Sequence, residues 1–416
     1  MSFKRMIKPM SVACVAMAVT GCGATPNASM ANEQITNGSL LTGPTELTIA
    51  GMFENAFIMS AAEQFEALHE GLSIRFVPTG DRASYGQIIN TSLMGGGGED
   101  IIMVNGLLAW ERLADAGMLV DLNQHLSFAP RVFYQNVLDA YVYNGARYVV
   151  PLSFGLDAFT IGDGVGIADV SALTLAGLAE LARIDSARDI IHTPMGMSEA
   201  MLAERFFSLH FDDFVNLAER SASVDTDQFV AMLETIAPMG ERLQMANWGT
   251  PAIVAETIFH NAFHIVEGLV DNVERFGLMV NDRGQGLVSA RAHVAVNANS
   301  ANQALAAEFV AFMLSEAMQT SPEIWSTPVN RAAARYNADR FIAVMEAEGF
   351  SAAGVDLEAN FTAFEALVAQ ASLRPTSDPF ILDFLREEVQ RFFDGEITAT
   401  QASVNLQARL MTYLHE

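Results

Sequence analysis

The sequence predicts an α/β fold in more than one lobe, on three observations. The chain has 416 residues, which exceeds one ordinary domain. Apolar residues make up 51% of it and charged residues 17%, so it can bury a hydrophobic core of normal size. From residue 47 onward, strand-like segments alternate with segments of helical spacing. This alternation is typical of parallel strands covered by helices.

The expected elements can be placed in order along the chain. At the start of the folded region we expect strand Leu47–Met52, helix 57–69, strand Leu72–Pro78, helix Tyr85–Met94 and strand Glu99–Val104. Later we expect a short strand Asp189–His192, and at the end two helices within 384–392 and 404–414 that are separated by the turn Asp394–Glu396.

Four consecutive glycines, Gly95–Gly98, lie between an expected helix and an expected strand. A phosphate-binding loop needs the order strand, glycines, helix and usually a lysine, whereas this chain has no GxxxxGK[ST] motif and no lysine after Lys8. The glycines therefore predict a helix end followed by a tight turn.

The N-terminus has the layout of a secretory signal. Lys4, Arg5 and Lys8 precede an apolar run from Met10 to Val19, which is too short to span a bilayer. The run ends in Val19-Thr20-Gly21-Cys22, which resembles a bacterial lipobox. That resemblance implies removal of residues 1–21, lipidation of Cys22 and attachment to the outside of the cell membrane, followed by a flexible tether over residues 22–45. An ordinary signal in which Cys22 is incidental is the alternative.

Charge and cysteine content exclude several classes of function. The formal net charge is -26, which would repel nucleic-acid phosphates, so no nucleic-acid partner is expected. Cys14 and Cys22 are the two cysteines of the chain, and Cys14 leaves with the signal. The mature protein should therefore have no internal disulfide, no cysteine metal site and no catalytic thiol.

Residues 85–125 (YGQIINTSLMGGGGEDIIMVNGLLAWERLADAGMLVDLNQH) resemble the N-lobe segment of carbohydrate-type, family 1 extracellular solute-binding proteins of ABC importers. Glu99-Asp100 stands where Pro-Asp is usual in that family, and Gly117-Met118-Leu119 stands where Gly-Leu is usual. Further segments resemble the family in the same order: 143–157, 276–318, 327–331 and 392–414.

The resemblance implies a periplasmic-binding-protein-like architecture with C-terminal helices, in which two α/β lobes are joined by a hinge. Lobe 1 would comprise 46–152 plus 288–325, and lobe 2 would comprise 157–285 plus 328–416. It also implies capture of a sugar or oligosaccharide in the interlobe cleft by a monomer, delivery to a membrane permease, no cofactor and no catalysis.

Candidate ligand-binding residues follow from the chemistry of sugars, which offer hydroxyl groups around an apolar ring face. Ligands of open α/β lobes bind beyond the carboxyl ends of the strands, which favours the loops at 53–55, 79–81 and 105–106. Helix capping is the alternative role for Asn55 and Asp81. Trp248 lies in a polar, turn-rich setting, whereas Trp110 and Trp325 fit core or hinge packing as well. The full set of candidates is Phe53, Asn55, Asp81, Asn105, Trp110, Phe154, Met197, Trp248 and Phe380.

One histidine pair leaves metal binding open. Glu256, His260, His264 and Glu267 would share a face if residues 255–268 were helical, and His-x3-His is a spacing found in metal sites. If residues 258–266 were a strand instead, the histidines would lie roughly 13 Å apart, too far to share an ion. We expect no metal site and favour a solvated or hydrogen-bonded face.

Rival functions come from other classes of protein. A surface glycosidase or esterase would need paired carboxylates or a nucleophile motif, and no GxSxG or HExxH is present. A receptor with the same two-lobe fold but no permease remains open, as does a cationic solute such as a polyamine or peptide.

Overall fold

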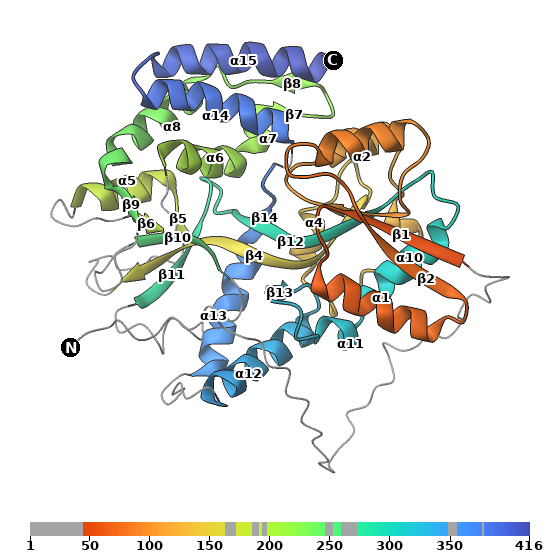
Figure 1. The fold of residues 1–416 in the computed structure, drawn as a ribbon. Helices are drawn as coiled ribbons and strands as arrows, with labels where there is room; N and C mark the ends of the chain where they lie inside the picture. Colours follow the sequence, from red (N-terminus) through yellow and green to blue (C-terminus); the bar gives the residue numbers. More distant parts are fainter. Residues whose placement is uncertain are drawn as a thin grey trace, which may run out of the picture. The chain divides into compact units, whose positions relative to one another are not determined.

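The computed structural model describes residues 45–162, 172–184, 191–193, 198–245, 253–258, 273–347, 356–376 and 378–416. Within these residues, one mixed sheet of twelve strands forms the centre of the fold, and a second sheet has two strands (Figure 1). The residues Cys22, Met197, Trp248, His260, His264 and Glu267, for which the sequence made predictions, lie outside the described residues.

The N-terminal alternation of strands and helices is confirmed. Its elements are β1 (Thr45–Gly51), α1 (Ala56–Leu68), β2 (Leu72–Pro78), α2 (Tyr85–Met94), β3 (Ile101–Val104) and α3 (Trp110–Asp115). The glycine turn after α2 is confirmed as well, since Gly96 and Gly98 have φ values of 75° and 95° that favour glycine. Asn297 holds the turn by donating from Nδ2 to the carbonyl oxygens of Gly97 and Glu99, at 3.0 and 3.1 Å.

The middle of the chain contributes mainly short elements and two long strands. In order these are η1 (Leu122–Gln124), α4 (Gln135–Asp139), β4 (Val149–Gly162), β5 (Ala172–Leu173), α5 (Leu175–Ile184), β6 (Ile191–Thr193), α6 (Glu199–Leu209), α7 (Phe211–Phe214), β7 (Val215–Asn216), β8 (Ser221–Ala222), α8 (Asp227–Ile236), η2 (Ala237–Arg242), β9 (Leu243–Met245), β10 (Ile253–Ile258), β11 (Val273–Met279) and β12 (Gly286–Val296).

The C-terminal part is mostly helical. It contains α10 (Gln303–Met313), α11 (Glu316–Gln319), β13 (Thr327–Pro328), α12 (Arg331–Ala347), α13 (Leu357–Gln370), β14 (Ala371–Leu373), α14 (Pro379–Phe393) and α15 (Ala399–His415). The two expected terminal helices are therefore present. Asp378 caps α14 ahead of Pro379, and Thr398 with Gln401 forms a capping box on α15, so side chains fix both starts. None of the described helices is both long enough and apolar enough to cross a membrane.

Strand direction divides the large sheet into zones. Strands β2, β1 and β3 run parallel, as do β10, β6 and β9, which confirms the parallel pairing expected from the alternation. Between these zones, β12 pairs antiparallel with both β3 and β4, and β4 pairs antiparallel with β10. The long strands β4 and β12 thus connect two sets of parallel strands.

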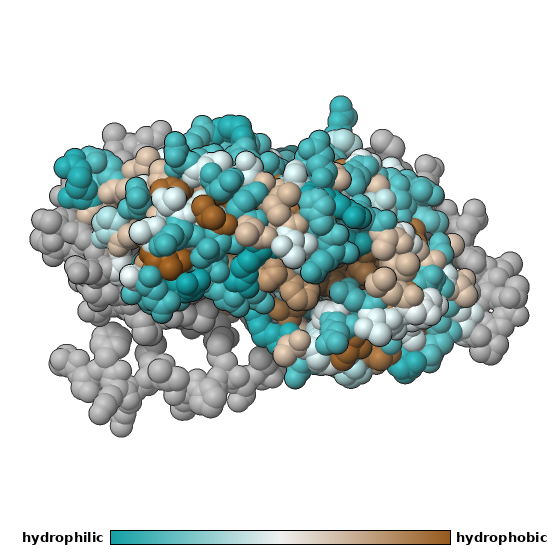
Figure 2. All heavy atoms as spheres, turned by 90° about the horizontal axis from the view of Figure 1, so that it is seen from above, coloured by the Kyte–Doolittle hydropathy of each residue, from teal (hydrophilic) through white to brown (hydrophobic). Residues whose placement is uncertain are grey.

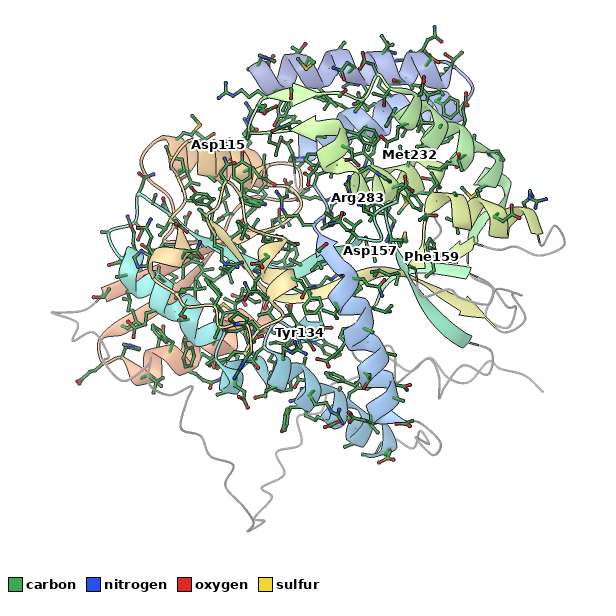
Figure 3. The ribbon with its side chains drawn as sticks, turned by 180° about the vertical axis from the view of Figure 1, so that it is seen from behind. Asp115, Tyr134, Asp157, Phe159, Met232 and Arg283 are labelled. Carbon is green, nitrogen blue, oxygen red and sulfur yellow. The ribbon has the colours of Figure 1, made fainter. Side chains whose placement is uncertain are left out.

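Two clusters of buried hydrophobic residues lie along these connecting strands. The first cluster contains the side chains of β1, α1, α2 and α10, and the second contains those of α6, α8, α14 and α15. Strand β4 contributes to both, because Phe154 belongs to the first cluster and Phe159 to the second. In Figure 3, Tyr134 marks the first cluster and Met232 the second, and Asp157 on β4 lies between them.

The change from one cluster to the other does not come at residue 328, where lobe 2 was expected to resume. Helices α12 and α13 pack into the first cluster, for example through Phe361 and Phe364, and α14 is the first later helix in the second cluster. Asn136 on α4 helps to hold this arrangement by donating from Nδ2 to the carbonyl oxygens of Val368 and Ala371, both at 2.6 Å. The apolar face of a helix predicts that the helix is buried, but it does not predict which of the two clusters the helix packs against.

Candidate functional site

Polar loops follow the ends of three neighbouring parallel strands. Phe53–Asn55 follow β1, Thr79–Asp81 follow β2, and Asn105 and Gly106 follow β3. Because β2, β1 and β3 are parallel and adjacent, these loops share one edge of the sheet. The structure therefore brings the predicted residues Phe53, Asn55, Asp81 and Asn105 to the edge at which open α/β lobes bind ligands.

Three polar side chains at this edge stabilise their own loops. Asn55 caps α1, since its Oδ1 accepts from the Ile58 amide at 3.2 Å. Asp81 accepts from the Ser84 hydroxyl at 2.7 Å, and this hydrogen bond contributes most to holding the pKa of the exposed carboxyl below its usual value. Asn105 Oδ1 accepts from the Leu107 amide at 2.9 Å. The capping role weighed for Asn55 is thus present, whereas Asp81 holds the turn before α2, whose N-cap residue is Ser84.

The aromatic candidates separate into exposed and buried residues. Phe53 is 69% exposed and Phe380 is 52% exposed. Trp110 and Phe154 are fully buried. Trp110 therefore has the core role that was weighed for it, whereas the expectation that Phe154 faces the cleft is wrong. Phe154 lies edge-on to Tyr134 with ring centroids 5.4 Å apart, and its strand pairs with β12 along one edge and with β13 along the other.

Trp325 is the aromatic residue that sequence reasoning undervalued. We expected core or hinge packing for it, yet 78% of its surface is exposed. It is placed beside the connecting strand, since Ser326 donates to the Ser153 hydroxyl at 2.7 Å and β13 pairs with β4 at Ser153 and Phe154. Its polar neighbours Ser326 and Thr327 were the available signal, the same signal that singled out Trp248.

The helix over residues 255–268 that was considered for the histidine pair is wrong over its first residues. Residues 253–258 form strand β10, so Glu256 is not on a helix. No group of three metal-ligating side chains occurs among the described residues.

A cavity of about 470 Å³ lies where α3 faces α14 and α15. Seen from the side of α15, hydrophobic residues gather in a hollow near the middle of the face (Figure 2). Phe380 lines this cavity, whereas Phe53, Asn55, Asp81 and Asn105 do not. The lining comprises Asn90, Met94, Ala109, Glu111, Arg112, Leu113, Asp115, Ala116, Tyr143, Leu217, Arg220, Asp378, Phe380, Tyr413, Leu414 and Glu416.

A buried ion pair lies beside the cavity. Arg374 contacts the Glu111 carboxylate at 2.5 Å, and the side chains are 15% and 2% exposed. The Arg374 guanidinium also lies over the Trp110 ring, 4.9 Å from its centroid. This ion pair links α3 to the segment between β14 and α14, where the packing changes from the first cluster to the second.

Asp378 is a buried carboxylate in the cavity wall. It is 2% exposed and accepts from the Tyr413 hydroxyl at 2.9 Å and from the amide of Phe380 at 3.0 Å. Burial raises the pKa of Asp378 to about 6, against the lowering effect of the Tyr413 hydrogen bond.

The raised pKa predicts the effect of Asp378→Asn on stability. The folded state binds this proton more tightly than the unfolded state. The free energy of unfolding of the wild type therefore falls as the pH rises from about 4 to 6, and the whole decrease remains above pH 6. Asparagine keeps the helix cap and removes the charge. We expect Asp378→Asn to raise the free energy of unfolding at pH 7.5 by on the order of 2–3 kcal/mol, with little difference at pH 4. Urea unfolding at both pH values measures this, and a gain of equal size at pH 4 would contradict it. The charged group on α3 that faces Asp378 is Glu111, and Tyr413, over whose ring Arg112 lies, faces it from α15.

The fold, rather than the sequence, relates this chain to known proteins. No family model and no curated protein matches its sequence. Among solved structures, it is similar to an extracellular solute-binding protein family 1 member from Alicyclobacillus acidocaldarius, at 14% identity and a TM-score of 0.59, covering 90% of this chain and 99% of that one.

Two other solved structures are similar over the same extent. One is the maltose/maltodextrin-binding domain MalE from Bdellovibrio bacteriovorus bound to maltotriose, at 15% identity and a TM-score of 0.57, covering 89% of this chain and 100% of that one. The other is titled as a de novo designed esterase, at 14% identity and a TM-score of 0.61, covering 90% of this chain and 100% of that one. The chain therefore has the mixed α/β fold of the periplasmic-binding-protein-like solute-binding proteins.

Proposed function

We propose that this protein is the extracellular solute-binding subunit of an ABC importer and that it captures a sugar or oligosaccharide. The observation that carries the proposal is the fold, shared over about nine-tenths of the chain with a protein bound to maltotriose. The edge formed by the β1, β2 and β3 loops supports it, because it presents an exposed Phe53 beside polar side chains. Aromatic faces with neighbouring hydrogen-bonding groups suit a sugar ring and its hydroxyls.

Capture requires two lobes that move relative to one another. We assign the first cluster, including α12 and α13, to one lobe and the second cluster to the other. Strands β4 and β12 and the segment around Arg374 connect them. A ligand held by both lobes would shift the equilibrium toward the closed form, which a permease can recognise.

The attachment and partners of the protein belong to the same proposal. The signal-like residues 1–21 and the lipobox-like Val19–Cys22 support a monomer anchored outside the cell by a lipid on Cys22 and delivering solute to a permease. We assign no catalytic step to the protein. Trp248 and Met197 remain proposed ligand contacts on the second lobe.

A thermal-shift screen with mono- and oligosaccharides tests the proposal. A ligand that binds only the native state must stabilise it, by roughly 2.7 kcal/mol at a hundredfold excess over Kd. Maltose, maltotriose and longer maltodextrins are the first probes. A shift with polyamines or basic peptides alone would overturn the sugar assignment, and turnover of any probe by the pure protein would overturn the binding function.

Trp325 provides a sharper test within that screen. We propose that its exposed ring is a platform for the sugar, so Trp325→Ala should remove most of the sugar-induced shift, on the order of 1–2 kcal/mol. Because the residue is 78% exposed, the melting temperature without sugar should change little. Trp325→Phe keeps an aromatic face and should restore part of the shift. An unchanged shift in Trp325→Ala would exclude the platform role.

A further inference from the structure

The cavity between α3, α14 and α15 combines aromatic walls with carboxylates. Tyr143, Phe380 and Tyr413 supply three rings, and the Phe380 and Tyr413 centroids are 5.4 Å apart. Four carboxylate side chains line the same space, from Glu111, Asp115, Asp378 and Glu416, whereas two guanidinium groups do, from Arg112 and Arg220. The lining thus has an excess of negative charge.

Among these charged side chains, those of Glu111, Asp115 and Arg112 contact another charged or aromatic side chain. Glu111 pairs with Arg374, and Asp115 accepts from the Tyr143 hydroxyl at 2.8 Å. Arg112 lies over the Tyr413 ring, 4.4 Å from its centroid. Asp378 is 2% exposed and accepts hydrogen bonds from the Tyr413 hydroxyl and from the amides of Phe380 and Ile381, but no cation among the described residues forms an ion pair with it.

A buried carboxylate without a cation is costly to the folded state. Capping of α14 does not require the charge, since asparagine caps a helix equally well. A buried carboxylate in a cavity wall is a candidate binding group. A cation in the cavity would supply the missing charge partner.

We propose that this cavity binds a small organic cation that carries an alkylated ammonium group. The carboxylate of Asp378 would pair with the positive charge, and the faces of Phe380 and Tyr143 would contact the alkyl groups and attract the cation through their ring electrons. Anions are disfavoured by the four carboxylates. A bare metal ion is disfavoured because no three-ligand group occurs among the described residues.

The space available agrees with such a ligand. About 470 Å³ accommodates a methylated ammonium group with a short polar extension. The exposed edge of Phe380 leaves one side of the cavity accessible to solvent.

Titration calorimetry with choline chloride tests the proposal on the full mature chain. Because the chain is strongly acidic, each titration is matched by sodium chloride at the same ionic strength, which separates binding from general screening. We expect saturable binding of choline and none of sodium. Asp378→Asn should weaken choline binding at least tenfold, and Phe380→Ala should weaken it several-fold.

Asp383→Asn is the matched control. Asp383 lies on the same helix, its side chain is 61% exposed, and it pairs with Arg386 outside the cavity. This variant should bind choline as the wild type does.

Three results would overturn the proposal: equal responses to choline and sodium, wild-type binding by Asp378→Asn, or loss of binding in Asp383→Asn equal to that in Asp378→Asn. The site does not depend on the proposed sugar function. If no carbohydrate binds but choline does, the sugar assignment fails and the cation site stands. If Asp378→Asn loses choline binding but keeps its response to sugar, the two sites are separate.

Discussion

Replacing Arg374 with methionine is expected to lower the free energy of unfolding by about 3–5 kcal/mol, because the buried Glu111 carboxylate then loses the cation that contacts it. Both side chains are largely withdrawn from water, so solvent cannot replace the guanidinium. The contact of Arg374 with the Trp110 ring is lost as well. Urea unfolding of the purified variant measures the effect.

The double variant Glu111→Gln with Arg374→Met is the control. Removing both charges should recover most of the lost stability, because an uncompensated buried charge costs more than a pair of neutral groups. If Arg374→Met costs less than about 1 kcal/mol, the value typical of an exposed ion pair, then the ion pair is not buried in solution.

In a separate experiment, Phe154→Ala is expected to lower the free energy of unfolding by about 3–5 kcal/mol, because it empties a fully buried site in the first cluster. The ring also loses its edge-on contact with Tyr134. Trp325→Ala, which removes a larger but exposed ring from the neighbouring segment, should cost less than about 0.5 kcal/mol.

Comparing Phe154→Ala with Trp325→Ala distinguishes an aromatic residue of the core from an aromatic residue of the cleft. A cleft aromatic would tolerate alanine while losing ligand affinity, whereas a core aromatic loses stability first. Equal stability costs for Phe154→Ala and Trp325→Ala would contradict the burial described for both residues.

Local pattern was sufficient to predict the first three strands of the sheet and the helices between them. Strands β1 to β3 and helices α1 and α2 have their own apolar periods, and Gly96 and Gly98 mark the turn, so each element could be placed without knowing its neighbours. The capping residue Asn55 marked a helix start by the same local chemistry.

Long-range partners could not be predicted in this way. The ion pair of Glu111 with Arg374 joins segments far apart in the chain, and no local pattern connects them. The continuous apolar run Val149-Val150-Pro151-Leu152 before Phe154 did carry a signal, since such runs are typical of strands buried on both faces. The exposure of Trp325 depends on what β13 packs against, so it emerged only from the fold.

Closure around a solute is tested most directly by the distance between the two clusters. With Cys14 and Cys22 changed to serine, cysteines introduced at the exposed residues Glu63 on α1 and Glu234 on α8 carry a pair of spin labels. We predict that a saturating oligosaccharide from the thermal-shift screen shortens and narrows the distance distribution between the labels. An unchanged distribution, with the sugar shown to be bound, would contradict capture by closure.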